Sequence, residues 1–294
     1  MKKLLLIVNP ASGARRGRRF LPDMISLFSR GGYLVTVCLT EKRGDAADFA
    51  RQFAGEADLA VACGGDGTLN EVVAGLLSAG LETPIGYIPA GSTNDFAATL
   101  ALPLQIPKAC AAILSREPRP LDVGRFGSDR YFTYTASFGA FTSVSYATPQ
   151  NMKNLLGHTA YILQGIASLK DIRPVHMKIT AGGRDYENDY IFGAVCNSTS
   201  LGGVLKLEDE GIHMNDGLFE ALLIPYPGSL VRLNQIIAAL TAHRYDDPSL
   251  IFIRASAFTC EGAPDLSWTL DGEEAEGASS LEIRNLPGAI RLIC

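Results

Sequence analysis

The chain reads LAVACGGDGTLNE at residues 59–71. The apolar run 59–62 has the length of a strand, and residues 72–77 have the apolar pattern of a helix. A glycine-rich turn between a strand and a helix lets backbone N–H groups approach a phosphate, while the helix N-terminus contributes partial positive charge. The stretch therefore predicts a strand, a turn and a helix that together bind a nucleotide.

Four apolar runs of strand length occur in the first third of the chain. Three of them are separated by segments long enough for a crossover helix, which is typical of βαβ units and hence of a parallel sheet. The runs lie at residues 4–8, 33–39, 59–62 and 85–88. We therefore predict an N-terminal α/β domain with a parallel sheet.

Polar loops that contain glycine follow three of these runs. They are NPASG at residues 9–13, the turn at 64–70, and PAGSTND at 89–95. In open parallel sheets, ligands bind outside the carboxyl ends of the strands. We therefore expect the three loops to converge on one cleft.

The sequence changes in character beyond residue 118, where short runs rich in Tyr, Phe, Thr and Val alternate with glycines. Such a pattern is typical of an antiparallel sandwich or open barrel. We predict a nucleotide-binding α/β domain at 1–118 and a β-sandwich-like C-terminal domain at 119–283. The apolar run at residues 288–294 could return to either domain, and residues 284–294 could thus rejoin the first, although periodicity does not decide between the two.

Two helical segments interrupt the β-rich part, at residues 155–169 and 230–240. Both have apolar residues at mixed spacings of three and four, as in an amphipathic helix. The simplest interpretation is a helix packed on a sheet, and the alternative is a helix dedicated to a membrane.

Composition limits the class of protein. A length of 294 residues exceeds the usual size of a single core, which favours two domains. The formal net charge is 26 − 31 = −5, whereas general nucleic-acid-binding proteins need a surplus of basic residues. We therefore expect no nucleic-acid partner.

The six cysteines are scattered, with no CxxC pair and no histidine at metal-ligand spacing. This pattern is expected of reduced thiols. The N-terminal apolar run is too short for a signal peptide, and no window reaches the roughly 18 apolar residues of a membrane span. We expect a cytoplasmic protein that is soluble or peripheral to the membrane.

Asp66 is the unusual residue of the glycine-rich turn, because its carboxylate would repel a bound polyphosphate. The turn is neither a Walker A motif nor a GxGxxG motif. A Mg²⁺ ion between Asp66 and the phosphates would explain the carboxylate, since Mg²⁺ bridges carboxylates and phosphate oxygens. The alternative is an ordinary Asp-Gly turn, with Thr68 or Asn70 capping the next helix. The turn alone leaves both interpretations open.

The run GGDGTLNEVV at residues 64–73 closely resembles the nucleotide loop of the diacylglycerol kinase catalytic-domain family, which also contains sphingosine kinases and bacterial soluble lipid kinases. Three further stretches resemble that family in the same order along the chain: NPASG at 9–13, PAGSTNDF at 89–96 and LDGE at 270–273. A GGDGT motif alone is shared with NAD kinases and phosphofructokinases. The combination is more specific, and the resemblance covers the whole chain.

The resemblance implies ATP and Mg²⁺ as cofactors, a lipid-substrate role for the second domain, and a role for each matching residue. Asp66 would reach the catalytic Mg²⁺, and Glu273 would be the general base that takes the proton of a lipid hydroxyl. A second, structural Mg²⁺ would lie near His213, Asp216 and Leu218. The ATP site would be lined by Asn9, Thr40, Gly64, Gly65, Asp66, Gly67, Thr68, Asn70, Glu71 and Ser92.

Simpler interpretations exist for the two acidic sites. Asp271-Gly272 could form a two-residue hairpin turn, which would place Glu273, Glu274 and Glu276 in a solvated acidic cluster. Spacing alone favours that hairpin, whereas the family resemblance selects Glu273 as the base. Residues 215–217 could be a turn before a strand at 218–224, with no metal.

The chain departs from the family pattern at three places. Many bacterial relatives have a lysine after the NPxSG segment, where this chain has Ala14 followed by four arginines (Arg15, Arg16, Arg18 and Arg19). An arginine fork is not equivalent to a lysine in a tight site. Ser92 replaces a common threonine but keeps the hydroxyl. Asn215 replaces an aspartate beside the expected structural metal and removes one negative charge.

The resemblance implies an ATP- and Mg²⁺-dependent lipid kinase that phosphorylates diacylglycerol or a related lipid alcohol at a membrane surface. Such an enzyme would be cytoplasmic, peripheral to the inner face of the membrane, and would need an apolar cleft. Its walls could be Phe138, Phe141, Tyr146, Leu155, Leu156 and Tyr161, which could equally be core residues. An NAD kinase-like enzyme and a catalytically weak lipid- or nucleotide-binding regulator are the alternatives. A homodimer formed through an edge strand of the first sheet stays open.

Overall fold

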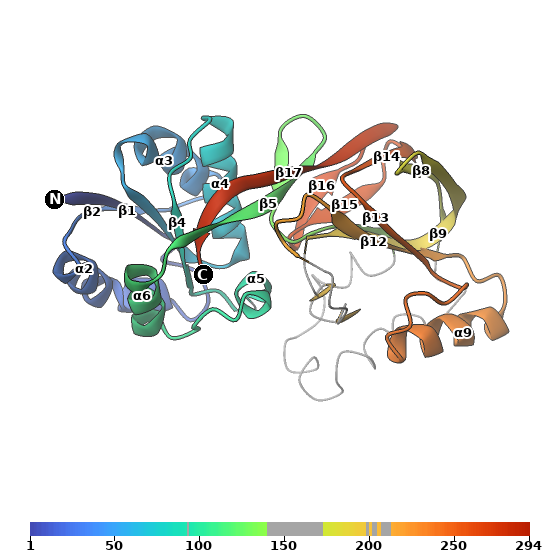
Figure 1. Cartoon of the computed structure of the whole chain (residues 1–294), viewed down its shortest axis with the longest axis horizontal. Coiled ribbons are helices and arrows are strands. Elements are labelled where there is room, and N and C mark those ends of the chain that lie inside the picture. The colour runs from blue at the N-terminus through green and yellow to red at the C-terminus, as the bar shows by residue number, and fades with distance from the viewer. Residues whose placement is uncertain (93, 140–172, 198–199, 202–204, 207–212) are drawn as a thin grey trace. The chain divides into compact units, whose positions relative to one another are not determined.

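The computed structural model of the chain describes residues 1–92, 94–139, 173–197, 200–201, 205–206 and 213–294 (Figure 1). These residues form two compact units. Unit 1 comprises Met1–Val123, Asp129–Thr133 and Leu286–Cys294, and unit 2 comprises Gly124–Ser128 and Tyr134–Asn285.

Unit 1 is built on a parallel sheet. Its strands are β1 (Lys2–Val8), β2 (Tyr33–Leu39), β3 (Leu59–Gly64), β4 (Ile85–Pro89) and the end of β17 (Ser280–Ile293). They lie in the order β17-β4-β3-β1-β2, and each neighbouring pair is parallel. The predicted α/β domain with a parallel sheet is confirmed, and all four apolar runs of the first third lie in strands.

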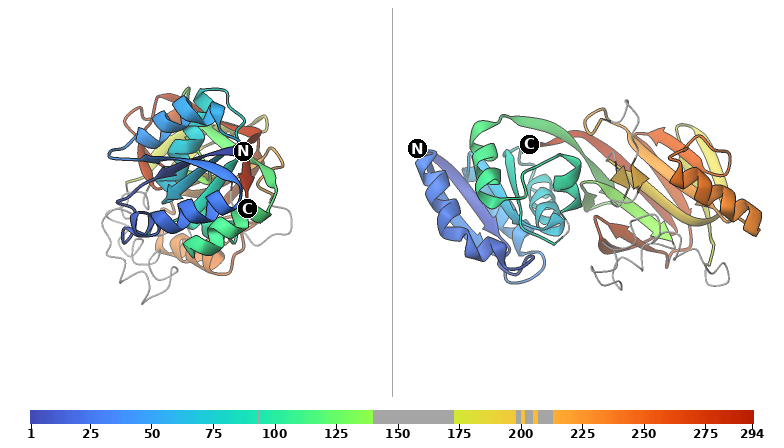
Figure 2. Two further views of the ribbon diagram at one scale, coloured as in Figure 1. Left: turned by 90° about the vertical axis from the view of Figure 1, so that its left-hand side faces the viewer. Right: turned by 90° about the horizontal axis from the view of Figure 1, so that it is seen from below.

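Helices cover both faces of this sheet (Figures 1 and 2). Met24 and Phe28 of one helix and Ile113 of another belong to a single buried core with Leu4 and Leu6 of β1. Cover on both faces explains why the central strand β3 has no exposed residue, as in other parallel sheets. The helices of unit 1 are α1 (Arg16–Arg19), α2 (Leu21–Arg30), α3 (Asp45–Phe53), the 3-10 turn η1 (Ala54–Glu56), α4 (Asp66–Ser78), α5 (Asp95–Thr99) and α6 (Ile106–Ser115).

Unit 2 is an antiparallel β structure, so the predicted β-sandwich-like domain is also confirmed. Its main path runs β16-β15-β7-β9-β8-β14-β17, and β12 pairs with both β9 and β13. The strands are the end of β5 (Pro118–Phe126), β7 (Thr135–Gly139), β8 (Val175–Ala181), β9 (Arg184–Cys196), β12 (Phe219–Pro225), β13 (Ile251–Ala255), β14 (Ala257–Gly262), β15 (Ser267–Leu270) and β16 (Glu273–Glu276). Three short strands complete the description: β6 (Arg130–Phe132) in unit 1, and the pair β10 (Ser200–Leu201) and β11 (Leu205–Lys206).

The last strand, β17, contributes residues to both units. Its first part pairs with β14 in unit 2, with Arg284 opposite Ala257. Its end pairs in parallel with β4 of unit 1, with Leu292 opposite Ile85. The apolar C-terminal run therefore joins the parallel sheet of unit 1 next to β4.

Helix α9 (Leu230–Thr241) packs on the sheet of unit 2. Ile236 and Leu240 of the helix share a buried core with Leu222 and Ile224 of β12. The expected helix at 230–240 is confirmed as one packed on a sheet, whereas the expected helix at 155–169 lies outside the described residues. Among the residues that the structure describes, no helix is both long and apolar enough to span a membrane.

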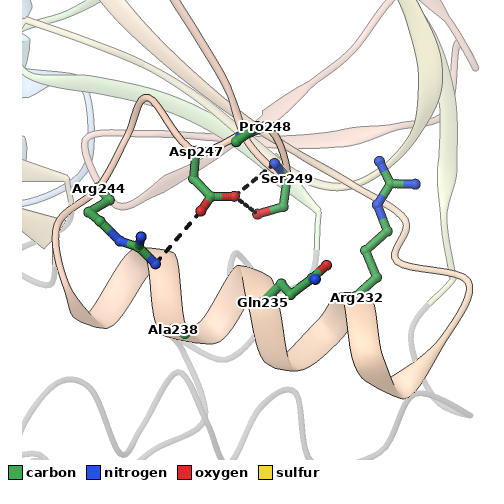
Figure 3. A pocket seen from close by; sticks show the side chains of 7 residues that line it. All are labelled: Arg232, Gln235, Ala238, Arg244, Asp247, Pro248 and Ser249. Atoms are coloured by element: carbon green, nitrogen blue, oxygen red, sulfur yellow. Dashed lines mark hydrogen bonds and ion pairs between the residues drawn. The ribbon is translucent and has the colours of Figure 1, made fainter.

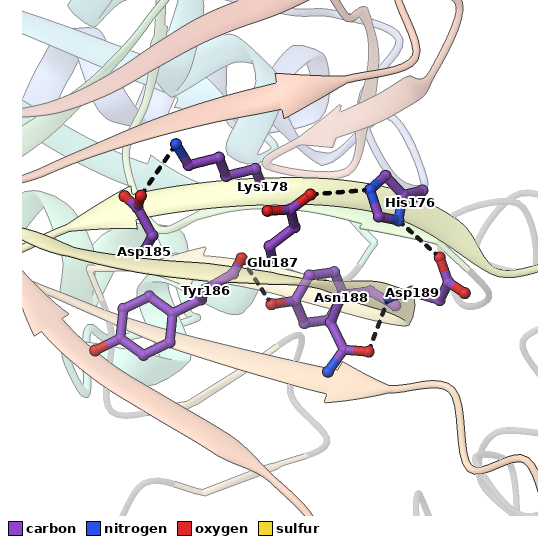
Figure 4. Close-up of polar contacts among 8 residues, drawn as sticks. His176, Lys178, Asp185, Tyr186, Glu187, Asn188 and Asp189 are labelled. Atoms are coloured by element: carbon purple, nitrogen blue, oxygen red, sulfur yellow. Dashed lines mark hydrogen bonds and ion pairs between the residues drawn. The ribbon is translucent and has the colours of Figure 1, made fainter.

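The outer face of the β8–β9 hairpin carries cross-strand ion pairs (Figure 4). The Nδ1 atom of His176 lies 2.9 Å from Oδ1 of Asp189, its partner across the ladder, and Nε2 lies 3.5 Å from Glu187. Nζ of Lys178 lies 3.0 Å from Oδ2 of Asp185. Because a carboxylate stabilises imidazolium, the hydrogen bond from His176 to Asp189 raises the pKa of His176 above its ordinary value.

We expect an NMR titration to give His176 a pKa above 6.5, its ordinary value. A raised pKa means that the pair stabilises the fold below the pKa of the unfolded state, and that this contribution is lost as the pH rises through the folded pKa. Asp189→Asn should lower the pKa of His176, whereas Asp185→Asn, which removes the partner of Lys178, should change it less. Equal titration of His176 in all three proteins would contradict the assignment.

Glu220 in β12 is a buried carboxylate that faces an arginine. Its side chain is 2 % exposed, and Nε of Arg254, opposite it on β13, donates a hydrogen bond of 3.0 Å to Oε1. The same guanidinium lies 2.9 Å from Oδ2 of Asp216. Burial raises the pKa of Glu220 to about 7, although Arg254 acts in the opposite direction. Ionised Glu220 is therefore stabilised by Arg254.

Removal of that cation should destabilise the fold in a pH-dependent way. We expect Arg254→Gln to lower the free energy of unfolding by about 1–3 kcal/mol at pH 8, where Glu220 is ionised and would lose its partner. The loss should be smaller at pH 5, because protonated Glu220 does not need a cation. Denaturant unfolding at the two pH values measures both effects, with the exposed Arg184→Gln as the matched control. A loss that is the same at both pH values would show that Glu220 does not titrate as described.

Candidate active site

The loops that follow β1, β3 and β4 lie against one another in unit 1. The N–H groups of Ala90 and Gly91 both donate to the carbonyl of Gly64, at 2.7 and 3.1 Å. The N–H of Asn9 donates to the carbonyl of Cys63 at 2.9 Å, which joins the first loop to the second. The structure thus brings together the three loops that the sequence predicts to converge.

Glycine makes this close approach possible at two positions. A Cβ atom on Gly91 would lie 2.5 Å from Cα of Gly65, which no real side chain tolerates. Gly13 has a φ of +52°, and a Cβ there would collide with the carbonyl oxygen of Ala90. The three loops therefore meet through backbone atoms at these positions.

Helix α4 begins directly after the glycine turn. Gly65 is its N-cap residue in an extended conformation, and its carbonyl accepts hydrogen bonds from the N–H groups of Thr68 and Leu69. Neither Thr68 nor Asn70 caps the helix: the hydroxyl of Thr68 accepts a bond of 3.4 Å from Asn9, and the amide of Asn70 donates to the carbonyl of Tyr131. Because no side chain among the described residues caps the helix, the first N–H groups of α4 are oriented for an anion.

Asp66 is tied to two elements by its carboxylate. Oδ1 accepts a hydrogen bond of 3.2 Å from the hydroxyl of Tyr87 in β4, and Oδ2 accepts one of 2.9 Å from the N–H of Asp95 at the start of α5. Burial and the charge of Asp66 both raise the pKa of Tyr87, so this hydroxyl stays protonated and acts as a donor. Asp66 therefore has a definite orientation between the N-termini of α4 and α5.

Tyr87 and Asn94 hold this arrangement together, although the sequence did not single them out. Asn94 has a φ of 56°, and its side chain accepts from the N–H of Gly91 and donates to the carbonyl of the same residue, both at 2.9 Å. Asn94 is a residue type that tolerates the left-handed conformation. The sequence signal for Asn94 was its place in the PAGSTND loop. Tyr87, in contrast, has the sequence context of an ordinary strand residue.

The remaining residues of the expected ATP site have different environments. Oxygens of Glu71 accept from the N–H groups of Gly44 and Ala46, at 2.9 and 3.1 Å, so this carboxylate caps the N-terminus of α3. Thr40 is buried and its N–H donates to the carbonyl of Val8. Ser92 is exposed. The hydrogen bonds of Glu71 to the backbone at the start of α3 are structural, and a role of Glu71 in nucleotide binding remains a prediction.

The carboxylate at the start of α4 suits a hydrated Mg²⁺ bound together with phosphates. The charges of Asp66 and Asp95 both raise the pKa of Tyr87, and the carboxylate of Asp66 lies 3.2 Å from its hydroxyl. Carboxylate oxygens are the ligands that Mg²⁺ prefers, and Mg²⁺ retains several waters. Within the described residues, no group of three or more His, Cys, Asp or Glu side chains forms a metal cage. Any Mg²⁺ here would therefore depend on waters and phosphate oxygens for its other ligands.

The LDGE segment in unit 2 forms the hairpin turn between β15 and β16. Leu270 and Glu273 are opposite each other in the ladder, and both turn residues have a positive φ, 49° for Asp271 and 86° for Gly272. The buried carboxylate of Asp271 accepts hydrogen bonds from the N–H groups of Tyr134 and Thr135, at 3.0 and 2.9 Å. Asp271 thus fixes the turn to the start of β7, and the expected hairpin is present.

The register of β16 separates Glu273 from the other acidic residues. Side chains alternate between faces along a strand, so Glu273 shares a face with Ala275, which is buried opposite Trp268. Glu274 and Glu276 lie on the other face and are exposed. Glu273 is partly buried. The hairpin and the proposed catalytic role of Glu273 are therefore compatible, because the turn positions this carboxylate differently from its neighbours.

The residues of the expected structural metal site are engaged with protein groups. Asp216 accepts the N–H of Leu218 with Oδ1, and Oδ2 lies 2.9 Å from the guanidinium of Arg254. The carbonyl of Leu218 accepts a bond of 3.2 Å from Asn285, and His213 is exposed. A guanidinium at this distance would repel a dication, so these side chains, as arranged, do not fit a metal. The second Mg²⁺ has no support from this geometry.

One residue of the expected apolar cleft can be placed. Phe138 is buried, and its ring packs 4.8 Å from that of Trp268 and 6.5 Å from that of Tyr190, measured between centroids. Phe138 is therefore a core residue of unit 2. The other expected cleft residues, Phe141, Tyr146, Leu155, Leu156 and Tyr161, lie outside the described residues.

Comparison with known proteins gives two family matches and several relatives. Residues 3–126 match the diacylglycerol kinase catalytic domain, and residues 135–294 match the YegS C-terminal NAD kinase beta sandwich-like domain. A diacylglycerol kinase of Bacillus subtilis strain 168 is 32% identical over 275 residues, which are 93% of this chain and 90% of that protein. A diacylglycerol kinase of Staphylococcus aureus strain MRSA252 is 32% identical over 92% of this chain and 86% of its own length.

Solved structures show the same architecture. A crystal structure of a diacylglycerol kinase from Bacillus anthracis strain Sterne has a TM-score of 0.76 at 22% identity, covering 99% of this chain and 96% of that one. A second crystal structure from the same strain has a TM-score of 0.82 at 25% identity, with 99% and 95% covered. Matched motifs, matched fold and near-complete coverage of its relatives agree, and the chain belongs to the diacylglycerol kinase catalytic-domain family.

Proposed function

We propose that this chain is a lipid kinase that transfers the γ-phosphoryl group of ATP to the hydroxyl of diacylglycerol or a related lipid alcohol, with Mg²⁺ as cofactor. Membership of the family supports the reaction class, and relatives that are similar over almost their whole length are named diacylglycerol kinase. The observation that carries the proposal is the convergence of three glycine-containing loops on the uncapped N-terminus of α4.

Unit 1 supplies the residues that would hold the phosphates of ATP. The backbone N–H groups at Gly65 and Gly67 and the N-terminal charge of α4 would bind phosphate oxygens, because no Cβ atom obstructs the approach. Bound Mg²⁺ would neutralise the charge that develops on the transferred group. Asp66 would hold it directly or through water, with Tyr87 and the N–H of Asp95 keeping the carboxylate in its orientation.

Unit 2 supplies the proposed base. Glu273 would accept the proton of the lipid hydroxyl as the hydroxyl oxygen forms a bond to the γ-phosphorus and the bond from phosphorus to the leaving oxygen of ADP breaks. Such in-line transfer needs mainly positioning and charge neutralisation, and a base contributes about 10²–10⁴-fold. The turn at Asp271 and Gly272 would fix Glu273 for this step, because the buried carboxylate of Asp271 immobilises the turn.

We expect Glu273→Gln to lower kcat by about 10²–10⁴-fold and to leave ATP binding unchanged, because glutamine keeps the size of the side chain but cannot accept the proton. Steady-state transfer of labelled phosphate measures the first, and calorimetric titration with ATP measures the second. Glu274→Gln and Glu276→Gln are the matched controls, since both residues lie on the exposed face of the same strand. Full activity of Glu273→Gln would remove Glu273 as the base.

The acceptor can be identified with labelled ATP and a panel of alcohols. We expect label in diacylglycerol, or in another lipid alcohol among monoacylglycerol, phosphatidylglycerol and sphingosine, and none in NAD. The panel includes NAD because residues 135–294 match an NAD kinase beta sandwich-like domain. Label in NAD alone would contradict the lipid kinase, and ATP binding without transfer to any acceptor would favour a regulator.

A further inference from the structure

The first turn of α9 exposes apolar side chains that the fold does not use. Leu230 is 67% exposed and Val231 is 70% exposed, and Tyr226, four residues before the helix, is 37% exposed. Among the large hydrophobic residues of the described chain, only Met1 is more exposed than these two helical residues. Adjacent exposed apolar residues of this size on a helix are a feature of interaction surfaces.

The opposite face of α9 provides the packing that holds the helix on the sheet of unit 2. Leu233, Ile236 and Leu240 are buried on the sheet of unit 2. The hydroxyl of Ser229 accepts the N–H of Arg232 at 3.3 Å and caps the helix. Leu230 and Val231 can therefore contact another molecule or a membrane without loss of the packing that holds α9 in place.

The sequence stretch that contains α9 has only basic charges, although Asp246 and Asp247 follow it directly. No aspartate or glutamate occurs between Glu220 and Asp246, whereas this stretch contains Arg232 and Arg244. The chain as a whole has a formal net charge of −5, so the segment differs in sign from the average of the protein. Apolar residues flanked by arginines, with no acidic residue among them, are complementary to a lipid surface that contains anionic headgroups.

A polar pocket lies beside the helix and contains both arginines (Figure 3). Its volume is about 560 Å³. Asp247, the carboxylate in the lining, accepts hydrogen bonds from the N–H and hydroxyl of Ser249 at 3.0 and 2.7 Å and lies 3.7 Å from Arg244. The guanidinium of Arg232 has no hydrogen-bond or ion-pair partner within the described part of the chain. The lining residues are Arg232, Gln235, Ala238, Arg244, Asp247, Pro248 and Ser249.

We propose that this surface, which we define as Tyr226, Leu230, Val231, Arg232 and Arg244, docks the protein on a bilayer that contains anionic phospholipids. Leu230 and Val231 enter the headgroup region, while Arg232 and Arg244 contact lipid phosphates. The inference supplies the membrane contact that the proposed function requires of an enzyme with a lipid substrate. It is tested by binding, so its failure is distinguishable from failure of the kinase assignment.

The test is co-sedimentation of the full chain with vesicles of equal parts phosphatidylglycerol and phosphatidylcholine, and with vesicles of phosphatidylcholine alone. We expect binding to the anionic vesicles that weakens with added salt, and little binding to the neutral ones. Leu230→Ser/Val231→Ser should lower vesicle affinity about tenfold or more, because the apolar contact is lost. Arg232→Gln should lower it about fivefold.

Matched controls distinguish binding through this surface from nonspecific binding to vesicles. Leu104→Ser replaces a leucine of unit 1 that is 51% exposed, and Arg184→Gln replaces an exposed arginine of unit 2 outside the surface. Neither should change vesicle affinity, and thermal melting should show that every variant is folded. Phosphorylation of a detergent-dispersed lipid by Leu230→Ser/Val231→Ser should remain near that of the parent protein.

Three outcomes would overturn the proposal. They are failure of the parent protein to bind anionic vesicles, equal binding to neutral and anionic vesicles, and unchanged affinity in folded Leu230→Ser/Val231→Ser. Loss of lipid phosphorylation in every format, with vesicle binding intact, would instead count against the kinase assignment and leave the docking surface standing.

Discussion

Unit 1 depends on the contact of two backbones, at Gly65 and at Gly91. There the loops after β3 and β4 approach so closely that a Cβ atom on Gly91 would lie 2.5 Å from Cα of Gly65. Hydrogen bonds from the N–H groups of Ala90 and Gly91 to the carbonyl of Gly64 hold the two loops together. Because glycine alone fits, no Cβ atom at position 91 separates these loops next to the N-terminus of α4, which can receive an anion.

The carboxylate of Asp66 has a structural role in unit 1. It accepts hydrogen bonds from the hydroxyl of Tyr87 and from the first N–H of α5, so its orientation is set by the fold before any ligand binds. Each carboxylate oxygen can accept more than one bond, which leaves acceptor capacity for a hydrated cation. Preorganisation of this kind lowers the reorganisation that binding or transfer would otherwise require.

In unit 2, backbone geometry places nearby acidic residues in different environments. Asp271 lies in a turn with positive φ and uses its buried carboxylate to hold the start of β7, whereas Glu273 begins β16 on the face of Ala275. At a third position, Asp216 pairs with Arg254, so a positive charge from the protein occupies the place where the family resemblance implies a metal. Similar residue types thus have different roles because their strands and turns orient them differently.

The sequence by itself determined the two-domain layout, the four strand runs of the first domain and the loops that meet at α4, because periodicity and glycine-containing turns are local signals. It could not assign the partners of Glu71, which caps α3, or of Tyr87, which holds Asp66, because both contacts join residues more than 20 positions apart. Nor could it separate the exposed residues Leu230 and Val231 from the buried ones of α9. Only the tertiary structure decided these points, since burial and long-range hydrogen bonds arise when distant segments pack together.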